Sequence, residues 1–93
     1  MDAPSHITYH KIAHTLELQW DHERYELPAE LLRVYSPSAE VRGHSSDQRI
    51  LQTGKKNVGI KLIEPVGNYA IRIAFDDGHD SGIYAWPYLH ELS

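Results

Sequence analysis

The chain has 93 residues, contains no cysteine, and carries a formal net charge of −4 when its seven histidines are neutral. This length supports one small domain with one core, and the lack of cysteine excludes disulfides, thiolate metal sites and a cysteine nucleophile. A net negative charge argues against a nucleic-acid binder, which normally presents a basic face.

Neither a membrane anchor nor a secretory signal is evident. No apolar run approaches the ~20 residues that span a bilayer. Residues 1–5, MDAPS, lack the basic and then apolar layout of a signal peptide. We therefore expect a cytoplasmic protein without a membrane partner.

The first third of the chain has the pattern of β-strands. Residues 1–6 are expected to fray. The range 7–20 has strand character, most clearly from Thr15 to Trp20, where apolar and polar residues alternate. A turn is expected at 21–23, and the alternation then continues on a returning strand.

A short helix is predicted next, from Pro28 to Tyr35, because proline is well tolerated at the first helical position. Leu31, Leu32 and Tyr35 are expected to face the core. Ser36 and Pro37 resemble a second helix start. The polar range 43–56 is expected to be a mobile loop.

The last third alternates again and then ends in a helix. Strands are expected at 58–62, 69–75 and 81–84, turns at 65–68 and 76–80, and a closing helix from Trp86 to Leu92. The whole pattern predicts one α+β domain over residues 1–93. Its expected architecture is a mostly antiparallel sheet of five or six strands with two or three short helices.

Three blocks of the chain match a known family. They are residues 32–44, residues 65–70 (PVGNYA) and residues 75–89, in which FDDGHDSGIY is the most specific stretch. They resemble the amino-terminal domain of γ-butyrobetaine hydroxylase. They also resemble small bacterial proteins, catalogued as a domain of unknown function, that consist of this domain alone.

The resemblance implies that the family's zinc site is lost here. In the hydroxylase, three cysteines and one histidine bind a structural zinc. The matching histidine is His79, whereas Ser36, Ser38 and Val41 stand at the cysteine positions. Hydroxyl groups and a valine cannot replace thiolates as zinc ligands. The domain also occurs attached to a P-loop ATPase of iron–sulfur cluster delivery, which implies a docking or delivery role by analogy alone.

Enzymatic motifs are missing from the sequence. No histidine is followed two residues later by an acid, as non-haem iron oxygenases require, and the chain is too short for their catalytic domain. Gly54-Lys55-Lys56 lacks the other residues of a phosphate-binding loop. We therefore expect no catalytic activity, no catalytic residues and no cofactor.

The acidic turn at residues 76–80 has the most reactive composition. It could hold a weak divalent-metal or cationic-ligand site, helped by Glu40 or His44. The candidate metal ligands are His79, Asp76 and Asp77. Alternatively, the aspartates cap a bend while His79 is hydrogen-bonded to the segment at 36–41. We favour this second interpretation, so no bound metal is expected.

Two other groups of residues are candidate sites. His6, His10 and His14 are spaced by four, but on a strand that spacing spans about 13 Å, so solvated histidines are favoured over a chelating trio. Tyr69, Tyr84, Trp86 and Tyr88 could form an aromatic binding face, although small cores commonly bury such residues.

The sequence thus favours a non-catalytic accessory module that docks onto another protein. Its interaction surface is expected within segments 33–44 and 76–88. The residues concerned are Arg33, Ser36, Ser38, Glu40, His44, Asp77, His79, Tyr84 and Trp86. The alternative is a small metal-binding or metal and iron–sulfur delivery accessory that acts through His79 and the neighbouring carboxylates.

Overall fold

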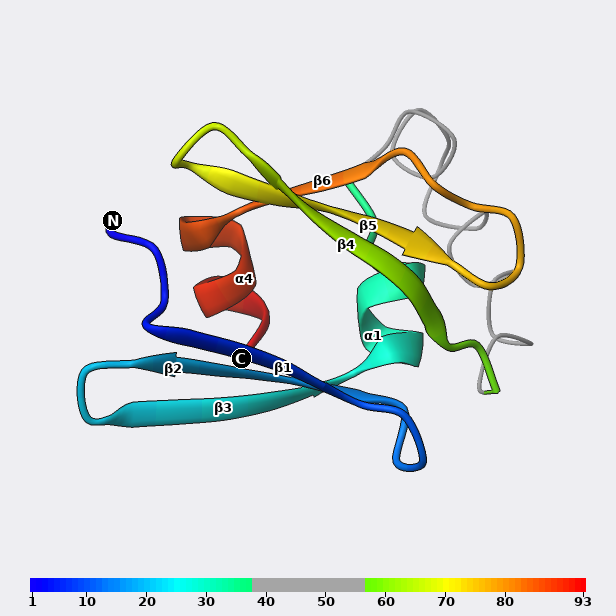
Figure 1. The fold of residues 1–93 in the computed structure, drawn as a ribbon, viewed down its shortest axis with the longest axis horizontal. Coiled ribbons are helices and arrows are strands. Elements are labelled where there is room, and N and C mark those ends of the chain that lie inside the picture. Colours follow the sequence, from blue (N-terminus) through cyan, green and yellow to red (C-terminus); the bar gives the residue numbers. More distant parts are fainter. Residues whose placement is uncertain (38–56) are drawn as a thin grey trace.

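The computed structural model describes residues 1–37 and 57–93 (Figure 1). These residues form two separate three-stranded antiparallel sheets, with strand orders β1-β2-β3 and β4-β5-β6. The elements are β1 His6–His10, β2 Thr15–Trp20, β3 Glu23–Pro28, α1 Ala29–Val34, β4 Ile60–Val66, β5 Ala70–Phe75, β6 Gly82–Ala85 and α4 Trp86–Leu92.

The expectation of a single sheet is therefore wrong, although the α+β class and the antiparallel pairing are confirmed. Each sheet is built from strands that are neighbours in sequence and joined by short connections. Alternation along a strand shows which face is buried, but it does not show which strands share hydrogen bonds. In the sequence, α1 and the residues after it lie between the first three strands and the last three.

The first sheet contains a hairpin turn that the sequence pattern did not indicate. The range 7–20, for which the sequence predicts strand character throughout, is divided into β1 and β2 by a turn at 11–14. The turn contains no glycine or proline, and His14 itself adopts a positive φ of 56°. The register pairs His10 with Thr15 and His6 with Gln19.

The N-terminal segment, expected to fray, is bonded to β2. The backbone N–H of Ser5 donates to the carbonyl of Gln19 at 2.7 Å, and β1 already begins at His6. The indole N–H of Trp20 donates to the carbonyl of Asp2 at 2.8 Å. A largely buried tryptophan needs an acceptor for its N–H, and this requirement positions the terminus.

Helix α1 begins one residue later than predicted. Pro28 is extended (φ −61°, ψ 140°), closes β3 and serves as the N-cap, and the helix ends at Val34. Leu32 is buried as expected, but Leu31 is only half-buried and Tyr35 is 38% exposed. A helix of six residues is unstable alone, so its packing on the core maintains it.

In the second sheet the central strand has the predicted inner face. Ile71, Ile73 and Phe75 are buried, whereas Arg72 lies on the opposite face. Strand β4 begins two residues later than predicted, at Ile60, and ends four residues later, at Val66. It includes Pro65, which an edge strand tolerates. The closing helix α4 spans Trp86–Leu92, as predicted.

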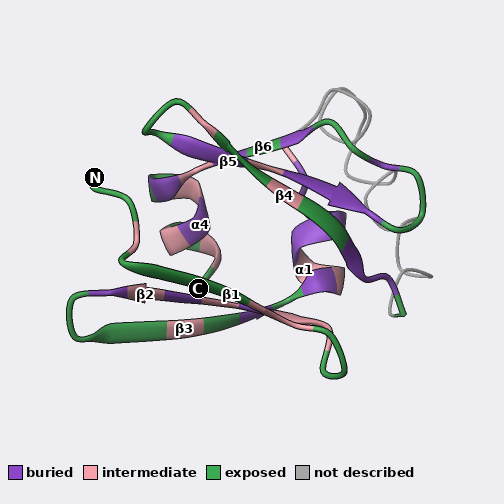
Figure 2. Cartoon of the chain, viewed as in Figure 1, coloured by how far each residue is buried: buried purple, intermediate pink, exposed green. Residues whose placement is uncertain are grey.

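The core lies between the inner faces of the two sheets and the two helices, where Figure 2 shows the buried residues gathering. It comprises Leu16, Leu18, Trp20, Leu27, Ala29, Leu32, Val58, Ile60, Ile71, Ile73, Phe75, Tyr84, Trp86 and Leu89. Two of the four aromatic residues considered as a binding face, Tyr84 and Trp86, are thus core residues. Tyr69 is 57% exposed.

Two further expectations concern residues 38–56. The continuation of a second helix beyond Pro37 and the mobile loop at 43–56 both lie outside the described residues. Within residues 1–37 and 57–93, no helix is long and apolar enough to cross a membrane.

Candidate functional site

The turn that connects β5 to β6 is closed by backbone hydrogen bonds. The N–H of Phe75 donates to the carbonyl of His79 at 2.8 Å. The backbone N–H of His79 donates to Asp77 Oδ1 at 3.1 Å, so this aspartate caps the bend as the sequence predicted. Gly78 has a φ of +94°, a conformation that side chains disfavour. The turn is therefore a defined structure with a required glycine.

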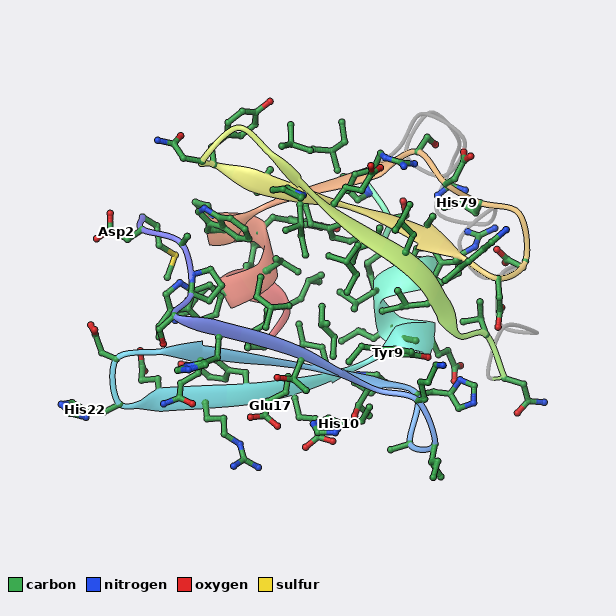
Figure 3. The ribbon with its side chains drawn as sticks, viewed as in Figure 1. Asp2, Tyr9, His10, Glu17, His22 and His79 are labelled. Atoms are coloured by element: carbon green, nitrogen blue, oxygen red, sulfur yellow. The ribbon has the colours of Figure 1, made fainter. Side chains whose placement is uncertain are left out.

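His79 is buried and connects the turn to the end of α1. Its side chain, located in Figure 3 on the β5–β6 connection, places Nε2 2.9 Å from the hydroxyl Oγ of Ser36. The residue is only 4% exposed, and Ser36 has no exposed surface. The hydrogen bond that the sequence predicted between His79 and this segment is therefore present, across 43 residues of sequence.

An ion pair lies between the same two parts of the chain. Arg33 Nε on α1 is 2.9 Å from Asp77 Oδ2, and the two side chains are 10% and 18% exposed. Another nitrogen of the same guanidinium, Nη1, is buried without a hydrogen-bond partner in the described part of the chain. Removing one partner of such a pair would leave a charge with little solvent, which is costly.

Tyr84 completes a polar cluster, which we define as Arg33, Ser36, Asp77, His79 and Tyr84, and all of its members except Asp77 are buried. The Tyr84 hydroxyl donates to the carbonyl of Leu32. Burial raises the pKa of this hydroxyl well above its usual range, and a hydrogen bond with Ser36 opposes that shift in part. A Cβ on Gly82 would lie 2.8 Å from Ser36 Oγ, so only glycine permits this close approach.

The predicted interaction residues are consequently placed mostly inside the molecule. Five of them are buried, namely Arg33, Ser36, His79, Tyr84 and Trp86. Ser38, Glu40 and His44 lie outside the described residues. The sequence correctly predicted that Ser36 and His79 come together in the fold. It did not predict that both are buried, because sequence spacing does not reveal what covers a polar residue.

The three candidate metal ligands do not converge. The carboxylate of Asp76 lies over Gly59, beside the hydroxyl of Tyr9 and Nδ1 of His14. Asp77 is engaged by Arg33, and Nε2 of His79 is engaged by Ser36. Across residues 1–37 and 57–93, no group of three or more histidine, aspartate or glutamate side chains is placed to hold a metal ion.

The histidine trio is also dispersed. His6 is hydrogen-bonded to its neighbour Ser5, and His14 Nδ1 lies 3.1 Å from the carbonyl of Val58. His10 Nε2 is 2.8 Å from Glu17 Oε1, and Figure 3 shows the two residues side by side on the first sheet. The hydrogen bond with His10 is the largest effect that lowers the pKa of the Glu17 carboxyl below its ordinary value.

Sequence reasoning missed an apolar groove beside α1. It is lined by Pro28, Glu30, Leu31, Val34 and Tyr35 and has a volume of about 300 Å³. The helical spacing of Leu31 and Tyr35 is the available signal, but the same spacing also predicts residues that face the core. In the fold, the opposite side of this short helix, with Ala29 and Leu32, takes the buried position.

Two three-stranded antiparallel sheets around one core, closed by short helices, define a small α+β domain. A family model described as "Gamma-butyrobetaine hydroxylase-like, N-terminal" matches residues 7–90. The chain therefore belongs to the family of γ-butyrobetaine hydroxylase-like N-terminal domains. A comparison with curated proteins finds no match.

Solved structures with the same fold are similar over almost the whole chain. A protein of unknown function from Acidithiobacillus ferrooxidans ATCC 23270, assigned to the DUF971 family, has 34% sequence identity and a TM-score of 0.79, and the match covers 96% of this chain and 90% of that one. Two proteins with NMR solution structures are 54% and 40% identical, with TM-scores of 0.80 and 0.77. The matches cover 99% and 100% of this chain and 73% and 70% of those chains.

Proposed function

We propose that the protein is a non-catalytic interaction module that docks onto another protein through the surface around the β5–β6 turn. The observation that carries the proposal is that the polar side chains of the candidate site bond to one another. Ser36 and His79 bond each other, and Asp77 pairs with Arg33. These contacts position the turn on the end of α1, and a turn held on a rigid scaffold is suited to recognition.

Burial of Ser36 argues against a hydrolytic enzyme. A serine hydroxyl beside an imidazole nitrogen resembles a nucleophile and its general base. However, Ser36 has no exposed surface, and Gly82 and Tyr84 close over its hydroxyl. A substrate cannot reach this oxygen without opening the core. The pair therefore supports a structural role better than a catalytic one.

The exposed part of the turn is acidic and fits a partner with a basic surface. Asp76, Gly78, Asp80 and Ser81 are exposed, whereas His79 between them points inward. The chain as a whole has a net charge of −4, which would also favour the approach of a basic partner.

Affinity capture from the native cell, read by mass spectrometry, tests this docking proposal. Wild-type bait should retain a specific protein, and Asp80→Lys should lose it because the acidic charge is reversed. Glu91→Lys, the matched change at an exposed position on α4, should retain it. Capture of the same proteins by all three baits, or no protein above background, would refute docking through the turn.

The second candidate function is a metal-binding or delivery accessory acting through His79 and its neighbouring carboxylates. We predict that the purified protein contains no stoichiometric zinc and that added Fe(II), Mn(II), Co(II) or Zn(II) leaves its melting temperature unchanged. The reason is that the Asp76 carboxylate lies over Gly59, the Asp77 carboxylate is engaged by Arg33, and Nε2 of His79 is engaged by Ser36.

Elemental analysis and thermal melts measure these two results. A metal at 100 times its dissociation constant would stabilise the native state by about 2.7 kcal/mol, which raises the melting temperature of a domain this small by roughly 10 °C or more. A saturable rise that disappears in His79→Ala and weakens in Asp77→Asn would replace the docking proposal with metal handling.

A further inference from the structure

The turn between β1 and β2 carries the most exposed large apolar side chain of the described residues. Ile12 is 98% exposed and follows Lys11 in this turn. The turn is fixed to the body of the domain, because the backbone N–H of Ala29 donates to the carbonyl of His14 at 2.8 Å. A single exposed isoleucine is ordinary by itself, so its meaning depends on what lies beside it.

The apolar groove beside α1 lies next to this turn. The bond from Ala29 to His14 joins the beginning of α1 to the turn, and Thr15 at the start of β2 pairs with Pro28, which lines the groove. Figure 1 shows the turn projecting from the same end of the domain as α1. The groove volume of about 300 Å³ is at the lower end of the range for small-molecule sites, roughly 300–1,000 Å³. It suits one aliphatic side chain better than a larger ligand. Its apolar lining consists of Pro28, Leu31, Val34 and Tyr35.

The turn and the groove carry opposite charges. Glu30 is the only charged residue that lines the groove, and Lys11 lies directly beside Ile12. Within residues 1–37 and 57–93, neither Lys11 nor Glu30 takes part in an ion pair. The carboxylates near the turn are already engaged on the first sheet, through the contacts His10–Glu17, Arg24–Glu17 and Thr15–Glu26. One cation beside the exposed isoleucine and one anion beside the groove are thus left to attract each other's counterpart.

A second copy of the chain offers both halves of this contact. Ile12 cannot occupy the groove of its own chain, because it is almost fully exposed. In a two-fold dimer, residue i of one copy contacts residue j of the other, and the reverse contact forms across the axis. Because turn and groove are neighbours, one axis between them brings each turn onto the opposite groove. A different protein would have to supply both a groove for Ile12 and a side chain for this groove.

We propose that the protein forms a two-fold homodimer in which Ile12 of each copy fills the groove beside α1 of the other, with Lys11 paired to Glu30. The contact is small, so the dimer is weak compared with the usual stable interface of about 1,200–2,000 Å². The surface does not include Asp80, whose charge reversal tests the docking proposal. Asp80→Lys should therefore leave the dimer intact, and the two proposals can fail separately.

Sedimentation analysis from about 1 µM to about 1 mM tests the dimer directly, since this range spans weak to moderate association. The mass of the wild type should rise from one to two chains within it. Ile12→Lys and Val34→Lys should each weaken association at least tenfold, because each places a lysine in the apolar contact. Ile83→Lys is the matched control, since Ile83 is 46% exposed on β6 in the other sheet, and it should leave association unchanged.

Charge exchange provides a second measurement that is specific to the reciprocal geometry. Lys11→Glu alone should weaken association about threefold or more by setting two carboxylates against each other, and Glu30→Lys alone should do so by setting two lysines together. An equimolar mixture of the two variants should associate more tightly than either alone, because both pairs are then restored. The double variant should recover association within a single chain. Melting curves at about 1 µM, where the protein is monomeric, verify that each variant is folded.

Three results would overturn this dimer. The first is a wild type that stays monomeric up to about 1 mM, even if another protein binds it and is lost in Ile12→Lys. The second is self-association that neither Ile12→Lys nor Val34→Lys weakens. The third is a mass that rises beyond two chains, because reciprocal contacts close at the dimer and an open head-to-tail contact does not.

Discussion

Ile73→Ala is expected to lower the free energy of unfolding by about 2–5 kcal/mol, the usual cost of truncating a buried isoleucine. Ile73 has no exposed surface and lies at the centre of β5, opposite Ile63 and Gly82 on the neighbouring strands. The surrounding core packs it from both sheets, so the truncation would leave a cavity. A domain of this size has a total stability of only about 5–15 kcal/mol, so the variant should be partly unfolded near its working temperature.

Denaturant-induced unfolding, followed by tryptophan fluorescence or circular dichroism, measures this loss. The same substitution at Ile12 is the matched control. Ile12 is 98% exposed in the β1–β2 turn, so its truncation should change the free energy of unfolding by less than about 0.5 kcal/mol. Equal losses at the two positions would show that the inner face of β5 is not the core.

His79→Ala is expected to cost about 1–3 kcal/mol of stability, because it leaves the buried hydroxyl of Ser36 without its imidazole partner. Ser36→Ala should cost a comparable amount, since it removes the same bond from the other side. The double variant should lose less than the sum of the two. The coupling energy for groups in direct contact is expected at roughly 0.5–3 kcal/mol.

This double-mutant cycle is measured by chemical denaturation of the four proteins in one buffer. Its control is a cycle between His79, on the connection from β5 to β6, and Thr8, on β1 of the other sheet. That cycle should be additive to within about 0.5 kcal/mol. Additivity between His79 and Ser36 would contradict the view that their bond connects the turn to α1.

The buried faces of individual strands could be predicted from the sequence. Alternation at Leu16, Leu18 and Trp20, and again at Ile71, Ile73 and Phe75, follows from the period of two that any half-buried strand must have. The closing helix after Ala85 could be predicted for a similar reason, since Pro87 is compatible with a first turn. These are local properties of the chain.

The candidate site was predictable only in part. The sequence anticipated a bond from His79 to the segment at 36–41, and the structure contains one to Ser36. The burial of that pair, and the separation of Asp76 from Asp77 and His79, could not be anticipated. Neighbours in a turn point in different directions, and the contacts of each depend on elements far away in sequence, such as Gly59 and Arg33.

The family, the α+β class, the buried faces of the strands and the absence of cysteine could all be read from the sequence alone, because they are encoded in residue type and local order. The tertiary structure was needed to establish that the strands form two sheets, that Tyr84 and Trp86 are core residues, and that Ser36 and His79 are buried together. The physical reason is that hydrogen-bond partners, burial and surface composition depend on which distant segments meet. Local propensity does not specify which distant segments come into contact.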